Sequence, residues 1–396
     1  MDVRGILLVT PGDSSGAVEF AGCPLPTLDV LGKSVLERAA EAMLACGFES
    51  VTILCHGHVL DQPWFRRRPD GPDSPVSWVR ISGEELWRKA EGAFNDLVRA
   101  GAELIVLQRM DLYAEVSYRN LLQFHLLKHA RVTSVCDDSG ALGIFCVSAS
   151  RRNDAAKIFR NRLEQIPVDY AEYRFNGYLN RLRNAKDLRD LSRDALLFRN
   201  RIIPEGREIR PGVWAGSGAR IERGARIVAP AYIGAHAKIR TRTVITRGSV
   251  VERYAQVDCG TVVEDSSVLP FCYVGAGLEL AHSVAGFHRL AHLRRQVEIE
   301  VPDSRLLGMH VQRPAYRAAN ALLSLTTFLP SALARGILRT GSKPLPQPAA
   351  EPSFASTLSS WGQSGPAAAR NPQPDSPEYP EQANPDLIAV RRYGDQ

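Results

Sequence analysis

The chain has 396 residues, a formal net charge of +6 and 44% hydrophobic residues. This length allows two or three domains, each with a sizeable core. The charge is modest and scattered, which argues against a nucleic-acid-binding protein. The one tight basic cluster, Arg66 to Arg68, lies in a Pro/Asp/Gly stretch that is typical of a solvated loop. No apolar run is long enough to span a bilayer.

The seven cysteines form no CxxC pair, and the chain begins with an apolar strand rather than a targeting peptide. We therefore expect a cytoplasmic protein with free, mostly buried thiols. The stretch CHGH brings Cys55, His56 and His58 together. Because three ligands so close rarely make a zinc site without a fourth, we expect this stretch to be a loop.

In the first 150 residues, predicted strands alternate with predicted helices. The strands cover residues 5–9, 50–55, 76–82, 103–108, 132–136 and 142–148, and the helices cover 33–46, 84–100 and 118–130. This alternation predicts an α/β, doubly wound, Rossmann-like domain with a mostly parallel sheet and helices on both faces. Ligands of such sheets bind beyond the carboxyl ends of the strands, where Asp111 and the loop after Thr10 are expected. Residues 151–198 are predicted to be helical.

A six-residue repeat follows. Apolar residues recur every six positions at Ile209, Ala215, Ile221, Ile227, Ile233, Ile239, Ile245, Val251, Val257, Val263 and Leu269. From position 215 on, a small residue or Thr follows each of them four places later. Six residues make one side of a triangular coil, so the pattern predicts a left-handed β-helix whose stacked coils share one core. The frame is predicted to slip by one near Pro270 and to continue at Val274 and Leu280.

We expect four parts: a first domain over 1–200, the β-helix over 201–300, a strand with an amphipathic helical segment over 301–340, and a tail over 341–396. The tail holds ten of the 25 prolines and is predicted to be disordered. For the apolar segment 313–339 we favour docking on the β-helix or on a partner chain. A peripheral membrane helix is the alternative.

Three stretches carry a resemblance to a known family. They are ILLVTPGDSSGAVEFAGCPLPTLDVLGKS from residue 6, IVLQRMDLYAEVSYRNLLQFHLLKHA from residue 105 and FNGYLNRLRNAKDLRDL from residue 175. Across most of residues 4–290 the chain resembles the sugar-1-phosphate nucleotidyltransferases, such as mannose-1-phosphate guanylyltransferase, which carry a C-terminal β-helix. The matched residues are Gly32, Lys33, Asp111, Phe124, His125, Gly177 and Tyr178.

The resemblance implies that Asp111 stands where the family's first Asp ligand holds Mg²⁺. Gly12, Gly16 and Lys33 are then remnants of the nucleotide-binding segment. Other expected groups are replaced. In the signature loop of the family, GxGTR, Asp13 replaces the second Gly and Ser15 replaces the Arg. Leu25 replaces the Lys of the family's Pro-Lys-Pro element, and Arg181 replaces its second metal ligand. The Glu-Lys-Pro motif of the sugar-binding layer is absent, and that layer is shortened.

Joining two phosphate-bearing substrates depends on metal and cationic side chains, so these replacements bear on activity. The first hypothesis is a non-catalytic regulatory or scaffold subunit of nucleotide-sugar or polysaccharide biosynthesis. It would bind a catalytic paralogue or a second copy, with a nucleotide sugar as a possible ligand. No nucleic acid is expected, and a cofactor, Mg²⁺, is expected only if the chain is active.

A second hypothesis is an active Mg²⁺-dependent transferase that forms a nucleotide sugar from a nucleoside triphosphate and a sugar 1-phosphate. Lys33, Arg109 or Arg181 would then supply cations from new positions. A third hypothesis is an acyltransferase on the β-helix with a His general base. The candidate bases are His236, His282, His288 and His292.

Overall fold

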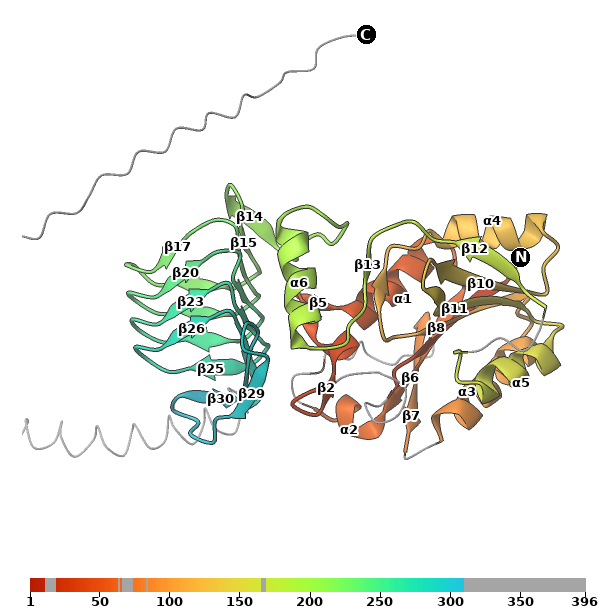
Figure 1. The fold of residues 1–396 in the computed structure, drawn as a ribbon, viewed down its shortest axis with the longest axis horizontal. Helices are drawn as coiled ribbons and strands as arrows, with labels where there is room; N and C mark the ends of the chain where they lie inside the picture. Colours follow the sequence, from red (N-terminus) through yellow and green to blue (C-terminus); the bar gives the residue numbers. More distant parts are fainter. Residues whose placement is uncertain (11–18, 63–64, 66–73, 83–84, 165–168, 310–396) are drawn as a thin grey trace, which may run out of the picture. The chain divides into compact units, whose positions relative to one another are not determined.

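The N-terminal part of the chain is built on a seven-stranded sheet with the order β12-β10-β11-β8-β1-β6-β7 (Figure 1). The computed structural model describes residues 1–10, 19–62, 65, 74–82, 85–164 and 169–309, all within one unit, Met1–Ala321. The segment 313–339 and the tail from 341 lie outside the described residues. No helix in the described part has the length and apolar character that crossing a membrane requires.

The sheet is mostly parallel, as the alternating pattern predicts. β1 (Val3–Leu8) lies between β6 (Ser50–His56) and β8 (Leu104–Arg109), and β7 (Val76–Ile81) continues the parallel order. β11 (Gly140–Ser148) runs antiparallel to β8 and to β10 (Val132–Asp137). β8 is almost completely buried, which agrees with its continuous apolar sequence.

Helices cover both faces of this sheet, which confirms the expected layering. α1 (Val35–Ala45) and α4 (Tyr118–Leu127) pack in one core with the sheet, while α3 (Leu86–Arg99) and α5 (Arg152–Arg160) pack in the other. α1 begins where Ser34 and Glu37 form a reciprocal capping box, each accepting the other's backbone N–H. The helix is thus where the pattern predicts it, but it begins at Val35 rather than at residue 33, because Ser34 is its cap and Lys33 and Ser34 form a short strand.

Two expectations for this part are wrong. Residues 151–198 are not all helical, because β12 (Ala171–Arg174) and β13 (Leu179–Asn180) lie between α5 and α6 (Ala185–Leu196). These strands are short and partly exposed, so they lack the apolar alternation that marks a strand in sequence. The CHGH stretch is not a loop either, since it ends β6 and begins the short helix α2 (Gly57–Leu60).

Shorter elements complete the N-terminal part. A two-stranded pair, β2 (Glu19–Phe20) and β3 (Cys23–Pro24), precedes the 3₁₀ helix η1 (Leu25–Thr27). β4 (Asp29–Val30) and β5 (Lys33–Ser34) then form a hairpin whose turn is Leu31–Gly32. β9 (Tyr113–Ala114) pairs with β13.

Residues 207–309 form three sheets, named here I, II and III. The members of sheet I are β14 (Arg207–Arg210), β15 (Val213–Ala215), β18 (Ala231–Ile233), β21 (Val250–Val251), β24 (Ser267–Val268), β27 (Ser283–Gly286), β28 (Arg289–His292) and β29 (Val297–Glu300). Sheet II has β16 (Arg220–Ile221), β19 (Lys238–Ile239), β22 (Gln256–Val257), β25 (Cys272–Val274) and β30 (Leu307–Met309). Sheet III has β17 (Arg226–Ile227), β20 (Val244–Thr246), β23 (Val262–Glu264) and β26 (Glu279–Ala281).

Most residues of the six-residue repeat fill the core between the three sheets, but Ile221 is exposed, contrary to the prediction, because β16 is the end strand of sheet II. Parallel pairing joins Ile221 to Ile239 and Ile239 to Val257, so each step spans eighteen residues, or three repeats. One core cluster contains Ile227, Ile233, Ile239, Ile245, Val251, Val257 and Val263.

Two further positions of the predicted six-residue repeat need correction. Val251 pairs with Val268, which lies seventeen residues further, so the frame slips before Val268 and not near Pro270. Leu269 therefore leaves the frame and joins the core shared with the N-terminal sheet. Ile209 also lies outside the frame, because β14 turns back antiparallel to β15 and leaves Ile209 exposed.

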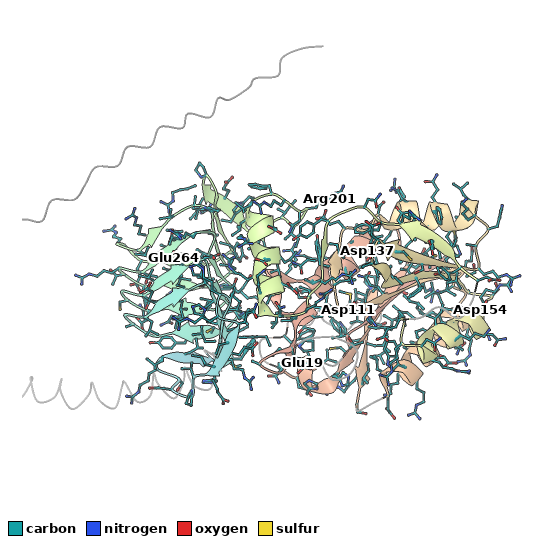
Figure 2. All side chains as sticks on the ribbon, in the orientation of Figure 1. Glu19, Asp111, Asp137, Asp154, Arg201 and Glu264 are labelled. Atoms are coloured by element: carbon teal, nitrogen blue, oxygen red, sulfur yellow. The ribbon has the colours of Figure 1, made fainter. Side chains whose placement is uncertain are left out.

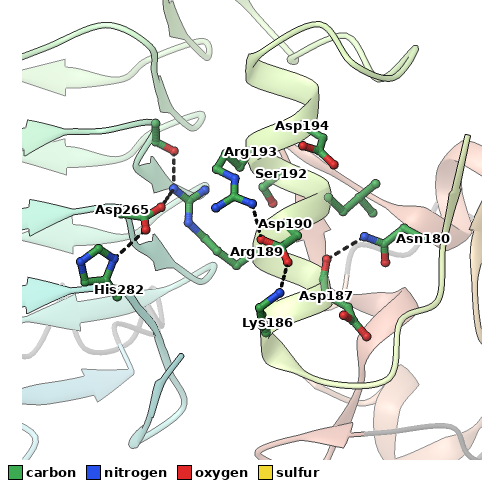
Figure 3. Close-up of polar contacts among 12 residues, drawn as sticks. Asn180, Lys186, Asp187, Arg189, Asp190, Ser192, Arg193, Asp194, Asp265 and His282 are labelled. Atoms are coloured by element: carbon green, nitrogen blue, oxygen red, sulfur yellow. Dashed lines mark hydrogen bonds and ion pairs between the residues drawn. The ribbon is translucent and has the colours of Figure 1, made fainter. Parts of the chain in front are cut away.

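The outer side of sheet I shares a core with the N-terminal domain. Tyr232 and Val250 lie in the same apolar cluster as Leu31 and Leu191. α6 also reaches sheet I through Arg189, which is almost completely buried and donates from Nη2 to the Gly248 carbonyl at 2.8 Å and to Asp265 at 3.0 Å (Figure 3). Asp265 in turn lies 2.6 Å from His282 Nδ1. The two parts are therefore joined by both apolar and ionic contacts.

Candidate functional site

Two carboxylates lie at the carboxyl edge of the N-terminal sheet. Asp111 follows β8 and Asp137 ends β10, so both lie where ligands of an α/β sheet bind (Figure 2). Arg181 follows β13, which pairs with β9 beside Asp111. The structure therefore brings Asp111 and Arg181 to one edge, as the resemblance implies, and adds Asp137.

Each carboxylate is held by a guanidinium. Arg109 Nη2 lies 2.7 Å from Asp111 Oδ2, and Arg109 Nη1 lies 3.1 Å from Glu164. Arg181 Nη2 lies 2.7 Å from Asp137 Oδ2 and also contacts the Ser139 hydroxyl. The side chains of Arg109 and Asp111 are only 13% and 15% exposed, so solvent screens this pair less than a surface pair.

Burial dominates the titration of Asp111. It raises the pKa of Asp111 above the usual value, although the Arg109 and Arg181 guanidiniums act in the opposite direction. For Asp137, burial works to raise the pKa, but hydrogen bonds from Ser139 and Arg181 outweigh it and lower the pKa. The influence of Arg181 on Asp111 shows that the two ion pairs form one electrostatic cluster.

The donor set at this edge does not fit Mg²⁺. This ion prefers octahedral oxygen ligands, which proteins supply through one or two carboxylates together with substrate phosphates. Here one oxygen of Asp111 pairs with Arg109, and the charge of a second guanidinium, Arg181, also acts on Asp111. In the described part of the chain, no cluster of three or more His, Cys, Asp and Glu side chains is arranged for a metal.

Two atoms of the cluster have no hydrogen-bond partner among the described residues. Asp111 Oδ1 is buried and accepts no hydrogen bond from any described residue, and Arg109 Nε is likewise without an acceptor there. Orphaned buried polar atoms usually carry a cost of about 1–3 kcal/mol. They are the one feature of this edge that a bound polar group would satisfy.

The other predicted site residues are placed differently. Lys33 lies at the start of α1, and its Nζ is 3.1 Å from both carboxylate oxygens of Glu41. Leu25 is completely buried in the apolar core, so it presents no group to a phosphate. The expectations for Gly12, Asp13, Ser15 and Gly16 fall on residues 11–18, outside the described part.

A cavity with a volume of about 210 Å³ lies between α1 and the β8–β9 connection. Gln108, Tyr113 and Tyr118 contribute polar groups to its lining, and Tyr118 Oη donates to Gln108 at 2.5 Å. Asp111 and Lys33 do not line it. The cavity is therefore separate from the ion-paired cluster.

The β4–β5 hairpin is fixed to sheet I by a buried carboxylate. Glu252 accepts hydrogen bonds from the backbone N–H groups of Leu31, at 2.7 Å, and Gly32, at 3.0 Å. Next to it, Arg253 donates to Asp29 at 2.6 Å. Burial and the nearby Asp29 raise the pKa of Glu252 to about 8. The Gly-Lys segment matched to the family thus makes a structural junction.

The histidine candidates for acyl transfer are also placed. His236 is exposed and stacks on Tyr254, with ring centroids 4.9 Å apart. His282 is held by Asp265, which also binds the buried Arg189. His288 and His292 are partly buried. Because Asp265 serves the α6 junction, the Asp265–His282 contact is explained by packing.

The seven thiols are free, and four of them are buried: Cys23, Cys55, Cys146 and Cys272. Burial raises the pKa of both Cys23 and Cys55 to about 12. Cys46 and Cys136 are partly buried and Cys259 is exposed, so the expectation of mostly buried thiols is confirmed with Cys259 as the exception. The buried thiols are therefore poor nucleophiles at neutral pH.

Sequence reasoning missed the role of Asp137. The available signal was its position, since it directly follows a predicted strand and so shares an edge with Asp111. In the second hypothesis, Arg109 supplies a positive charge that binds a substrate phosphate. The structure shows that Arg109 is paired with acidic side chains instead.

No protein-family model matches the chain, and no curated protein matches it significantly. Among solved structures, HddC from Yersinia pseudotuberculosis complexed with GMP-PN is similar at 14% identity, with a TM-score of 0.34. A second structure of HddC from the same organism gives 14% identity and a TM-score of 0.35. Both alignments cover 48% of this chain and 98% of the HddC chain. At this identity and TM-score, the likeness assigns neither a family nor a ligand.

Proposed function

We propose that the chain is a non-catalytic relative of the sugar-1-phosphate nucleotidyltransferases and serves as a regulatory or scaffold subunit in nucleotide-sugar or polysaccharide biosynthesis. In this proposal residues 1–200 are the transferase-like domain, and the three sheets of residues 201–300 are coils of a left-handed β-helix. The observation that carries the proposal is that two ion pairs, Arg109–Asp111 and Arg181–Asp137, lie at the sheet edge.

The argument is electrostatic. A transferase of this kind brings two phosphate-bearing substrates together, so it needs cations that face the substrates and a carboxylate that faces a metal. Here the cations Arg109 and Arg181 are occupied by acidic side chains of the chain itself. Their charge would repel a divalent metal, while the paired carboxylates would repel phosphate. The two guanidiniums are thus offset by three carboxylates, those of Asp111, Glu164 and Asp137, and neither guanidinium is left for a phosphate.

The buried Leu25 supports the same conclusion. A Lys at this position would supply a charge to a phosphate, whereas Leu25 is completely enclosed in the apolar core. Restoring a Lys there would place an ammonium among apolar side chains, which is costly without a partner. Leu25 therefore packs in the apolar core and makes no contact that would bind a substrate phosphate.

An active transferase is the second candidate. The feature that favours it is Asp111 Oδ1, which is buried and has no hydrogen-bond donor among the described residues. If substrate phosphates drew Arg109 and Arg181 away from the carboxylates, this oxygen would become available to a metal. The cost of breaking two ion pairs would then have to be offset by substrate binding.

The test is release of pyrophosphate from the full-length chain, with Mg²⁺ and panels of nucleoside triphosphates and sugar 1-phosphates. We expect no sugar-dependent release above a protein-free blank, with an active transferase as the positive control. Circular dichroism and a cooperative thermal transition establish that the protein is folded. Sugar-dependent release that disappears in Asp111→Asn would overturn the proposal and establish the active transferase.

A further inference from the structure

The outer face of sheet III carries a charge pattern that is complementary to itself. Its strands place Arg226, Val244, Val262 and Glu279 side by side in one column, each on the neighbouring strand. The column reads as one positive residue, two apolar residues and one negative residue. Arg226 and Glu279 are exposed, whereas the two valines are partly buried.

The charged ends of this column are not used within the described part of the chain. Among the described residues, neither the Arg226 guanidinium nor the Glu279 carboxylate forms a hydrogen bond or ion pair. Sheet I is the sheet that packs on the N-terminal domain, and Figure 1 shows β17, β20, β23 and β26 on the side of the stack away from α6. Within the described part of the chain, α6 and the N-terminal domain thus leave the outer face of sheet III uncovered.

We propose that this face binds a second copy of the chain. A twofold axis parallel to the strands, between β20 and β23, would bring two such faces together with their stacking directions opposed. Arg226 then faces Glu279 of the second copy, and Val244 faces Val262 of the second copy. In the second column Val228 faces Ala281 and Thr246 faces Glu264, so no like charges meet there. Glu264 is paired with Arg247 of its own chain at 3.0 Å. Such an interface is isologous and closed, so it produces a dimer and not a filament.

Sheet II provides the comparison that makes sheet III the better choice. Its outer column is Arg220, Lys238, Gln256 and Tyr273. The same twofold operation would set Arg220 against Tyr273 and Lys238 against Gln256. No opposite charges meet in this column. In the neighbouring column Arg240 would face Asp258 of the second copy, but Arg240 already donates to Glu222 and Asp258 already accepts from Tyr273 of the same chain. Sheet III therefore differs from sheet II because the opposite charges of its column, Arg226 and Glu279, have no side-chain partner among the described residues.

The size of the face sets the strength of the dimer. Four strands about 4.8 Å apart span only about 15 Å, well below the roughly 800 Å² per partner of a standard interface. The interface contributes two exposed ion pairs around a small apolar centre. Exposed ion pairs are screened by salt, so the dimer should be weak and should dissociate as ionic strength rises. This interface does not depend on whether the chain is catalytic.

Sedimentation velocity of the full-length chain, across protein concentrations and at low and high salt, tests the proposal. We expect a monomer–dimer equilibrium at low salt that shifts to monomer at high salt. Arg226→Glu and Glu279→Arg each set like charges opposite each other, so each should weaken the dimer by about tenfold or more. The double variant R226E/E279R restores the opposite charges and should restore the dimer.

The matched control is Arg220→Glu, which reverses a charge in the same coil but on sheet II. It should leave the dimer unchanged. Circular dichroism of every variant separates loss of the interface from loss of folding. A wild-type chain that stays monomeric at every concentration would overturn the proposal. The proposal would also be overturned by a dimer whose dissociation is unchanged in both single charge-reversal variants, or by an assembly larger than a dimer. A folded double variant that does not form the dimer again would overturn it too.

Discussion

At the scale of single residues, the Arg109–Asp111 pair is the feature most open to experiment. Asp111 is 15% exposed and burial raises its pKa, so its charge is tolerated because Arg109 lies 2.7 Å away. Arg109→Met would leave a buried carboxylate without its cation, and we expect a loss of about 3–5 kcal/mol in the free energy of unfolding. Asp111→Asn should cost less, because Arg109 keeps Glu164 at 3.1 Å. Urea denaturation of the two variants measures the difference.

The double variant R109M/D111N completes a mutant cycle, and it should be more stable than R109M alone because the isolated charge is removed. Arg99→Met is the matched control, since Arg99 pairs with Asp96 on the exposed surface of α3. That change should cost less than about 1 kcal/mol. If Arg109→Met were as mild as Arg99→Met, the ion pair would not be what stabilises the charge of Asp111.

At the scale of elements, periodicity in the sequence predicted most of the fold. Apolar alternation placed the central strands and the flanking helices, because their burial against one another creates the pattern. It could not place β12 and β13, since these strands are short and partly exposed. It also missed that Val268 and not Leu269 continues the repeat, because both residues are apolar and only packing distinguishes them.

The candidate site was less predictable than the fold. Strand ends and spacing brought Asp111 and Arg181 to one edge, but the sequence does not show which charges pair. Arg109 and Asp137 acquire their roles only through tertiary distances of 2.7 Å. The junction through Glu252 was likewise invisible, because it joins residues more than two hundred positions apart.

The turn of the β4–β5 hairpin shows how one element depends on another. Gly32 has a φ of +97°, and a Cβ there would lie 2.4 Å from Tyr232 Oη and 2.7 Å from Glu205 Cβ. Gly47 has a similar φ of +92°, but no neighbouring atom lies within 4 Å of its Cβ position. Gly47→Ala should therefore cost only the backbone strain, about 1 kcal/mol. Gly32→Ala should cost a further 1–3 kcal/mol or so, because it also overpacks the junction.

Thermal and urea unfolding of the two glycine variants provide the measurement. Their shared backbone conformation makes Gly47→Ala an internal control for strain. Equal losses of stability would show that the hairpin turn can withdraw from sheet I at no cost. A larger loss for Gly32→Ala would locate the stabilising contact at the hairpin tip.

At the scale of the whole molecule, the N-terminal domain and sheet I share one apolar cluster, so we expect them to unfold together. Glu252 links this unfolding to pH. Its pKa of about 8 in the folded chain lies above its ordinary value, because of burial and the nearby Asp29. Because the pKa of Glu252 is higher in the folded chain than in the unfolded chain, the protonated carboxyl stabilises the fold. This stabilisation is complete below the pKa of the unfolded chain and is lost as the pH rises through about 8. The chain should therefore lose stability between pH 6.5 and 8.5.

In this window the buried histidines act in the opposite direction to Glu252. Burial lowers the pKa values of His56 and His125, so up to about pH 7.5 only the unfolded chain still holds their protons, and losing them makes stability rise with pH. Glu252→Gln removes the titrating group, keeps one acceptor for the hairpin N–H groups and should flatten the decline. Glu222→Gln is the control, because an Arg240 hydrogen bond lowers the pKa of the exposed Glu222 and it titrates far below the window. Calorimetry at several pH values should show one transition for wild type, with a midpoint that falls as pH rises. A decline of equal slope in Glu252→Gln would mean that another group links the junction to pH.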